Sequence, residues 1–295
     1  MSMIEVRGLT KDYKKGRGIF DLHFSVEQGE VFGYLGPNGA GKTTTIRHLM
    51  GFLNPDAGRC RIAKMDCRKR ADAVQKRLGY IPGEIAFPGD MTGTAFLRFM
   101  AKYRGMQGAG RRDELLERFE LDPSGKLRKM SKGMKQKVGI VCAFQHDPAV
   151  LILDEPTSGL DPLMQNRFVQ LLLEEKQRGK TILMSSHMFE EIERTCERVA
   201  IIRKGRLVAV ESIETLKAAQ TQRYIITFAS PEAAEAFCGE ALEIEARQSH
   251  RVTVLTHGEL SALLAAMVNY PVTAIETPNQ GLEEVFMNYY GGQGA

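Results

Sequence analysis

Short apolar runs alternate with longer helical patterns along the first 220 residues of the chain. Each run is apolar on both of its alternating faces, as expected for a strand buried between two layers of helices. Strands that alternate with helices in this way predict an α/β core with a parallel sheet. The runs span residues 31–35, 150–153, 181–184 and 199–202.

A helical insertion is predicted within this core, at about residues 84–145. Over residues 92–103 the apolar side chains follow the spacing of one helix face, and we interpret them as core packing. Residues 111–121 show a second amphipathic helical pattern. The apolar face of the first helix consists of Phe96, Leu97, Met100 and Tyr103.

Beyond residue 220 the pattern changes to short elements in the order β-α-β-β-α-β, the split βαβ arrangement of a small ferredoxin-like α+β domain. The charge changes at the same point. Residues 221–295 contain three arginines and nine glutamates, a net charge of −6, whereas residues 1–220 contain 37 basic and 27 acidic residues, a net charge of +10. We therefore predict two domains, residues 1–220 and 221–295. The second has expected strands at 224–228, 243–247, 251–256 and 272–277, and expected helices at 232–240, 259–269 and 282–290.

Composition excludes several other classes of protein. With 295 residues, 43% hydrophobic and 26% charged, the chain has the content of a folded protein with one large or two ordinary domains. No apolar run approaches the roughly 18 to 20 residues of a membrane-spanning helix, and residues 1–15 lack the apolar stretch of a secretory signal. The net charge of +4 is too small to indicate nucleic acid as the partner. Five scattered cysteines without a CxxC pair indicate reduced packing thiols.

A phosphate-binding loop is the strongest local signal. Residues 36–43 match G-x-x-x-x-G-K-[ST] at every fixed position, after an expected strand and before an expected helix. Glycines let the backbone amides and the helix N-terminus approach phosphate oxygens closely. Lys42 is expected to reach the β- and γ-phosphates, and the Thr43 hydroxyl is expected to bind Mg²⁺. The loop residues expected to bind nucleotide are Gly36, Pro37, Asn38, Gly39, Ala40, Gly41, Lys42, Thr43 and Thr44.

Two acidic residues, Asp154 and Glu155, directly follow the apolar strand at 150–153. The C-terminal ends of parallel strands lie at the edge of the sheet where the phosphate loop also lies. Asp154 is therefore expected to position Mg²⁺, and Glu155 to polarise the attacking water. His187 follows another expected strand, where a histidine is either a satisfied polar residue or a contact to the γ-phosphate.

The order of these motifs resembles that of ABC-type ATP-binding cassettes. Residues 151–162 (LILDEPTSGLDP) carry the most specific part of the resemblance, which extends over about residues 3–215. Residues 130–134 (MSKGM) stand where the family has its LSGGQ signature, and Ser131 and Gly133 match it. The resemblance implies a P-loop NTPase cassette that binds ATP and Mg²⁺ and hydrolyses ATP.

The same resemblance implies roles for residues outside the phosphate loop. Tyr13 would stack on adenine, and His187 would be the switch histidine that contacts the γ-phosphate. Ser131 and Gly133 would bind the γ-phosphate held by an opposite subunit, and Asp161 would help to join the two subunits. The resemblance therefore implies a homodimer or a pair with a related cassette in the ATP-bound state.

One position departs from the family pattern. Gly83 stands where similar cassettes carry a glutamine, and Glu84 follows it. Glu84 is either a ligand of the metal or its water, or a solvated loop acid, and the sequence leaves both interpretations open.

Over its whole length the chain looks most similar to ATP-binding subunits of bacterial drug and peptide exporters of the bacitracin-resistance type. The similarity rests on residues 80–84, the SKGM signature and the LEEVF sequence at 282–286. It implies export of drugs, peptides or lipid-like substrates through a separate integral-membrane permease that docks beside residues 87–103. The chain would then be cytoplasmic, on the inner face of the cell membrane, with no nucleic-acid partner.

Two alternatives are weighed against this hypothesis. A soluble ABC-type clamp that acts on ribosomes or DNA usually has two cassettes or a long coiled coil, whereas this chain has one phosphate loop and one signature. A P-loop kinase would not explain the signature or Asp161.

Overall fold

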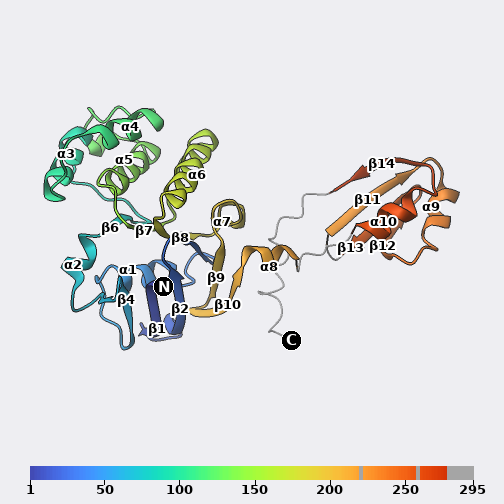
Figure 1. The fold of residues 1–295 in the computed structure, drawn as a ribbon, viewed down its shortest axis with the longest axis horizontal. Coiled ribbons are helices and arrows are strands. Elements are labelled where there is room, and N and C mark those ends of the chain that lie inside the picture. The colour runs from blue at the N-terminus through green and yellow to red at the C-terminus, as the bar shows by residue number, and fades with distance from the viewer. Residues whose placement is uncertain (219–221, 257–259, 278–295) are drawn as a thin grey trace. The chain divides into compact units, whose positions relative to one another are not determined.

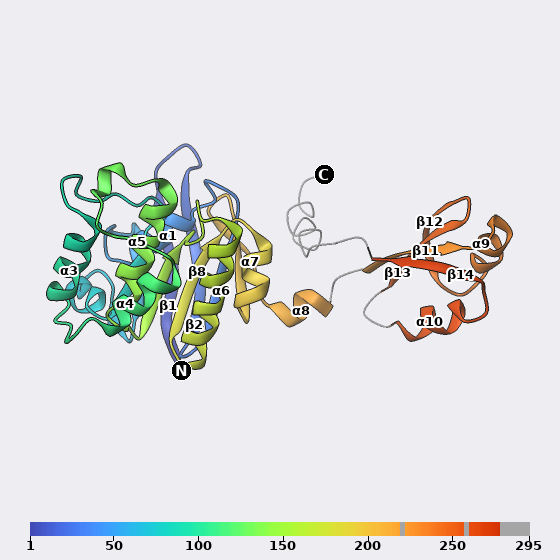
Figure 2. The same ribbon diagram turned by 90° about the horizontal axis from the view of Figure 1, so that it is seen from above.

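The computed structural model describes residues 1–218, 222–256 and 260–277, and the chain divides into two compact units, Met1–Glu211 and Ser212–Ala295 (Figures 1 and 2). The second unit begins with α8 (Ile213–Ala218). The functional division into residues 1–220 and 221–295 stays a prediction. In the described part of the chain, no helix combines the length and the apolar character needed to cross a bilayer.

A six-stranded sheet forms the centre of the first unit, in the order β10 (Arg206–Ser212), β9 (Arg198–Arg203), β3 (Val31–Leu35), β8 (Thr181–Ser186), β7 (Val150–Asp154) and β6 (Leu78–Ile81). The strands from β9 to β6 pair in parallel, and every residue of β3, β7 and β8 is buried. The four predicted apolar strands are therefore confirmed. Their C-terminal ends share one edge, which brings together the loops that follow β3, β7 and β8.

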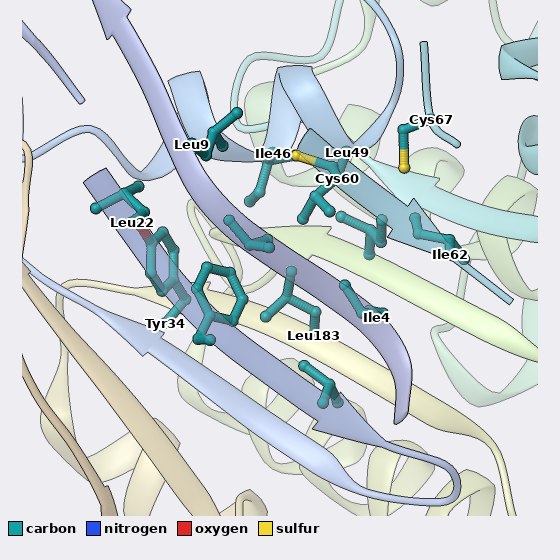
Figure 3. Packing of buried hydrophobic residues seen from close by; sticks show 14 of the residues in the cluster. Ile4, Leu9, Leu22, Tyr34, Ile46, Leu49, Cys60, Ile62, Cys67 and Leu183 are labelled. Atoms are coloured by element: carbon teal, nitrogen blue, oxygen red, sulfur yellow. The ribbon is translucent and has the colours of Figure 1, made fainter. Parts of the chain in front are cut away.

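A second, antiparallel sheet covers one side of this core, in the order β2 (Gly18–Glu27), β1 (Ser2–Asp12), β4 (Ala57–Ile62) and β5 (Met65–Asp66). Helix α1 (Lys42–Leu49) contacts β4 of this sheet and β7 of the central one. Figure 3 shows side chains of both sheets and of α1 in one apolar cluster, among them Ile4, Tyr34, Ile46 and Leu183. The sequence analysis did not identify this sheet, because its strands alternate buried and partly exposed positions.

The predicted helical insertion lies between β6 and β7. Thr92 caps α3 by accepting a hydrogen bond from the Ala95 amide, and Leu97 of that helix is buried. The expectation of core packing is wrong for Tyr103, whose side chain is 70% exposed at the C-terminal end of the helix. The insertion contains α3 (Gly93–Tyr103), α4 (Gly110–Arg118), the 3₁₀ turn Leu127–Lys129 and α5 (Lys132–Phe144), whereas α2 (Ala71–Gln75) precedes β6.

The second unit contains the expected ferredoxin-like order. Its strands pair in the order β12, β13, β11, β14, all antiparallel, and apolar residues of the sheet and of two helices form its core. Ser230 caps α9 through the Ala233 amide. The helix expected at 282–290 lies outside the described residues. The elements are β11 (Gln222–Phe228), α9 (Pro231–Phe237), β12 (Glu243–Gln248), β13 (Arg251–Thr256), α10 (Ser261–Met267) and β14 (Val272–Glu276).

Two histidines, the buried His48 and the partly buried His146, should make stability fall on mild acidification. Burial lowers the pKa of both imidazoles, so they take up a proton at a lower pH in the folded chain than in the unfolded chain. The unfolded chain takes up protons from about pH 6.5 downward, so each histidine destabilises the fold by at most about 1.4 kcal/mol per pH unit below that point. We expect urea unfolding to show a lower free energy of unfolding at pH 5.5 than at pH 7.5. The double variant His48→Gln/His146→Gln should show a smaller difference in the free energy of unfolding between the two pH values. An unchanged difference would show that these histidines are not its cause.

Candidate active site

The phosphate loop joins β3 to α1, and its glycines are required by close packing. Gly41 has a φ of 112°, and a Cβ there would lie 2.6 Å from Ile19 Cγ2. A Cβ on Gly36 would lie 2.4 Å from the carbonyl oxygen of Ile202. Helix α1 begins directly after Gly41, so its free amides and dipole face this loop. The backbone therefore forms a site for an anion.

Lys42 supplies a buried positive charge over this loop, with only 5% of its side chain exposed. Its Nζ atom donates to the carbonyl oxygens of Gly36 at 2.7 Å and Pro37 at 3.3 Å. The same atom lies 3.1 Å from Glu155 Oε1. The ammonium group is thereby held in a fixed position beside the acidic end of β7.

Asp154 ends β7 and is completely buried. Ser185 Oγ donates to its Oδ1, whereas its Oδ2 has no hydrogen-bond partner among the described residues. A Cβ on Gly83 would lie 3.0 Å from Oδ2, so glycine at this position avoids a close contact with the carboxylate. A buried, unpartnered carboxylate oxygen fits a hard cation such as Mg²⁺. Glu84 is exposed and does not line the cavity described below, so it is not brought to this site.

Glu155 adopts a left-handed backbone conformation, with a φ of 48°. Its amide donates to the backbone and side-chain oxygens of Ser185, at 3.2 and 3.1 Å, which fixes this turn. Its carboxylate then lies between two groups, because Oε2 is 3.1 Å from His187 Nδ1 and Oε1 contacts Lys42. The loops after β3, β7 and β8 thus bring a cation, a carboxylate and an imidazole into contact. Such a set can bind a polyphosphate and activate water.

A cavity of about 440 Å³ opens beside Lys42 and Glu155, whereas Asp154 and His187 are not among its lining residues. Tyr13, 45% exposed, lies on its wall together with most of the phosphate loop. An exposed aromatic ring at such a wall can stack on a base. The lining residues are Tyr13, Gly16, Arg17, Gly18, Pro37, Asn38, Gly39, Gly41, Lys42, Thr43, Thr44, Glu155 and Lys204.

Two of these lining cations, Arg17 and Lys204, were not identified from the sequence. Lys204 lies in the turn between β9 and β10. This turn is hydrogen-bonded to the phosphate loop, because the Gly205 amide donates to the Ala40 carbonyl at 2.9 Å. The Phe20 amide donates to the Gly205 carbonyl at 2.7 Å. The available signal was a Lys-Gly turn after a buried strand that ends at the same sheet edge.

The signature residues and Asp161 do not line this cavity. Ser131 caps α5 through the Met134 amide at 3.2 Å, and Asp161 caps α6 (Pro162–Gln177) through the Met164 amide at 3.0 Å. Both helix N-termini carry positive dipole potential, and neither is part of the cavity beside the chain's own phosphate loop. This separation is what a role toward a second subunit requires.

The signature is bonded to the loop that follows Glu155. Lys132 Nζ donates to Ser158 Oγ at 2.9 Å, and the buried Gln136 Nε2 donates to the Pro156 carbonyl at 2.6 Å. A Cβ on Gly133 would lie 2.7 Å from the Gly159 carbonyl oxygen. Glycine at 133 therefore allows α5 to start against this loop.

Comparison with known proteins agrees with this geometry. Residues 19–158 match the family model described as ABC transporter. The chain is 33% identical to the bacitracin transport ATP-binding protein BcrA of Bacillus licheniformis over 99% of this chain and 98% of that protein. It is 38% identical to the Nod factor export ATP-binding protein I of Paraburkholderia xenovorans over 78% of this chain and 77% of that protein. A solved ATP-binding subunit of an ABC transporter superposes with a TM-score of 0.68 at 34% identity, covering 73% of this chain and 92% of the other.

Proposed function

This chain belongs to the ABC transporter family as one of its ATP-hydrolysing, ATP-binding subunits, and on that premise we propose that it drives export through a separate membrane permease. The observation that carries the catalytic part of this proposal is the contact of Glu155 with both Lys42 and His187 beside the phosphate loop. The observation that carries export is the match, over nearly the whole chain, to a bacitracin transport ATP-binding protein.

ATP binding follows from the cavity. The adenine stacks on Tyr13, and the phosphates lie along the loop amides, where Lys42 neutralises the charge on the β- and γ-phosphates. Thr43 and Asp154 are the proposed Mg²⁺ ligands, because Thr43 lines the cavity and Asp154 has a free, buried carboxylate oxygen. The bound ion would neutralise phosphate charge. Glu84 is not included, since its side chain is exposed, whereas Asp154 is completely buried at the end of β7.

Hydrolysis requires a base and a fixed geometry. Glu155 accepts the proton of the attacking water, and the water oxygen bonds to the γ-phosphorus while the bond to the β-phosphate oxygen breaks. His187 holds the Glu155 carboxylate through its 3.1 Å contact and reaches the γ-phosphate from the end of β8. The products are ADP and inorganic phosphate.

Dimerisation would use groups that do not line the chain's own cavity. Ser131 and Gly133 at the start of α5 would contact the γ-phosphate bound by a second subunit, and Asp161 would contact that subunit at the start of α6. ATP then joins the two subunits, and its hydrolysis releases them. A homodimer or a pair with a related cassette would be formed.

The permease would bind the helical insertion on the inner face of the membrane. Phe99 and Tyr103 of α3 are 57% and 70% exposed, and aromatic side chains of this kind are enriched at protein interfaces. The proposed substrates are drugs, peptides or lipid-like molecules. A soluble clamp on ribosomes or DNA is the competing function.

The test is a pull-down of the tagged Glu155→Gln variant from detergent-solubilised membranes of its native host, with ATP and Mg²⁺. Because this variant should bind ATP without hydrolysing it, the assembled complex should persist. We expect a protein with several membrane-spanning helices to copurify. A Lys42→Ala variant, which should bind ATP roughly 10- to 100-fold more weakly, is the control for ATP-dependent assembly at an ATP concentration that saturates only Glu155→Gln. Recovery of ribosomes or DNA instead would favour the clamp.

A further inference from the structure

Glu191, on α7 (Phe189–Thr195), holds together two loops that carry different parts of the active site. Its Oε2 accepts a hydrogen bond from Ser186 Oγ at 2.7 Å, and its Oε1 accepts one from Thr157 Oγ1. Ser186 directly precedes His187, and Thr157 lies two residues after Glu155. One carboxylate therefore bonds to the loop after β7 and to the loop after β8.

The bond to Ser186 fixes the backbone on both sides of His187. Ser186 is buried, and while its hydroxyl donates to Glu191 its oxygen accepts from the Met188 amide at 2.9 Å. Ser186 thus links Glu191 to the backbone on both sides of His187.

The bond to Thr157 fixes the turn that carries Glu155. Thr157 is buried, and its carbonyl accepts from the Leu160 amide at 3.0 Å. The Ser158 amide in turn donates to the Glu155 carbonyl at 3.1 Å. Thr157 is therefore part of the same tight turn as the Glu155 carboxylate. Its hydroxyl bonds this turn to Glu191 on α7.

Helix α7 provides a rigid base for Glu191. Ile192 is completely buried against β3, at a point where Gly33 has no side chain: a Cβ there would lie 2.7 Å from Ile192 Cγ2. Thr195 Oγ1 donates to the Glu191 carbonyl at 2.6 Å. Since β3 leads into the phosphate loop, one short helix connects the elements that carry Lys42, Glu155 and His187.

We propose that Glu191 is a positioning residue for ATP hydrolysis, which sets the distance between the Glu155 and His187 loops. The inference rests on the catalytic roles proposed above for those two residues. Without the Glu191 carboxylate, two buried hydroxyls lose their acceptor, and the two loops lose the contact that joins them through α7. Displacements of about 1 Å at reacting groups can cost about 100-fold in rate. Nucleotide binding depends on the loop after β3 and should change little.

The experiment measures phosphate release and ATP affinity for purified Glu191→Ala, with Glu190→Ala as the matched control because Glu190 is exposed on the same helix. We expect kcat to fall about 10- to 100-fold in Glu191→Ala, with KM and the ATP dissociation constant within about twofold. Glu190→Ala should keep normal turnover. Glu191→Gln, which retains one carbonyl acceptor, should recover part of the loss.

A second variant pair separates positioning from a general effect on folding. Thr157→Val combined with Ser186→Ala removes both hydroxyls but leaves Glu191 in place, and it should reproduce most of the kcat loss while ATP affinity is kept. Normal turnover in this double variant, or in Glu191→Ala, would overturn the proposal. Glu155→Gln is measured in parallel. If that variant hydrolyses ATP normally, the catalytic role of Glu155 fails; if only the Glu191 variants are normal, the positioning role alone fails.

Discussion

Replacement of Glu155 by glutamine is expected to lower ATP turnover at least about 100-fold while ATP affinity stays within a few-fold. Glutamine has nearly the same volume, so the turn held by Ser185 should be kept. Its amide cannot accept the proton of the attacking water, and it removes the negative charge beside His187 and Lys42. ATP therefore binds but is not consumed, and a dimer formed around it should persist.

The measurement combines phosphate release, equilibrium ATP binding and size-exclusion chromatography with ATP and Mg²⁺. Glu190→Gln serves as the control, since it makes the same chemical change at an exposed position on α7. Normal turnover in Glu155→Gln would show that another group accepts the proton. Loss of ATP affinity in this variant would show that the carboxylate acts mainly in binding.

Replacement of Lys42 by alanine should instead impair nucleotide binding itself. Lys42 is the buried cation of the phosphate loop, and a hydrogen bond to a charged group contributes about 1.5–3 kcal/mol. Loss of one such interaction with phosphate corresponds to an increase of roughly 10- to 100-fold in the dissociation constants of ATP and ADP. Turnover should fall with it, because Glu155 also loses its partner.

Fluorescent-nucleotide titration and calorimetry measure this change directly. The control is Lys69→Ala, which removes an exposed lysine that does not line the cavity. If ATP affinity is unchanged in Lys42→Ala while turnover is lost, Lys42 stabilises only the transition state and does not contribute to nucleotide binding. Glu155→Gln and Lys42→Ala therefore separate nucleotide binding from the chemical step.

Much of the fold could be predicted because the informative patterns are local. A strand buried on both faces is apolar throughout, so β3, β7 and β8 were evident as short apolar runs. The phosphate loop and the acidic end of β7 were recognisable because the chemistry fixes both residue type and spacing. The order of elements in the second unit followed from its caps and alternating strands.

Other features depend on contacts between distant segments. Burial of Tyr103 was expected from helix spacing, but the spacing does not show where the packing surface ends, and the ring extends past it. Lys204 reaches the cavity only because Gly205 bonds to Ala40 of the phosphate loop. Glu84 was a candidate metal ligand from its place in the sequence, but its side chain is exposed. The neighbouring Gly83 is the residue that lies against Asp154.

The bonds from α5 to the loop after Glu155 have a mechanical consequence. Lys132 and Gln136 hold Ser158 and Pro156, and Gly133 leaves no gap between the helix and this loop. A tilt of α5 would therefore displace the loop that follows Glu155. We therefore expect that a partner bound to the outer surface of the helical insertion would change the position of Glu155, and with it the rate of ATP hydrolysis.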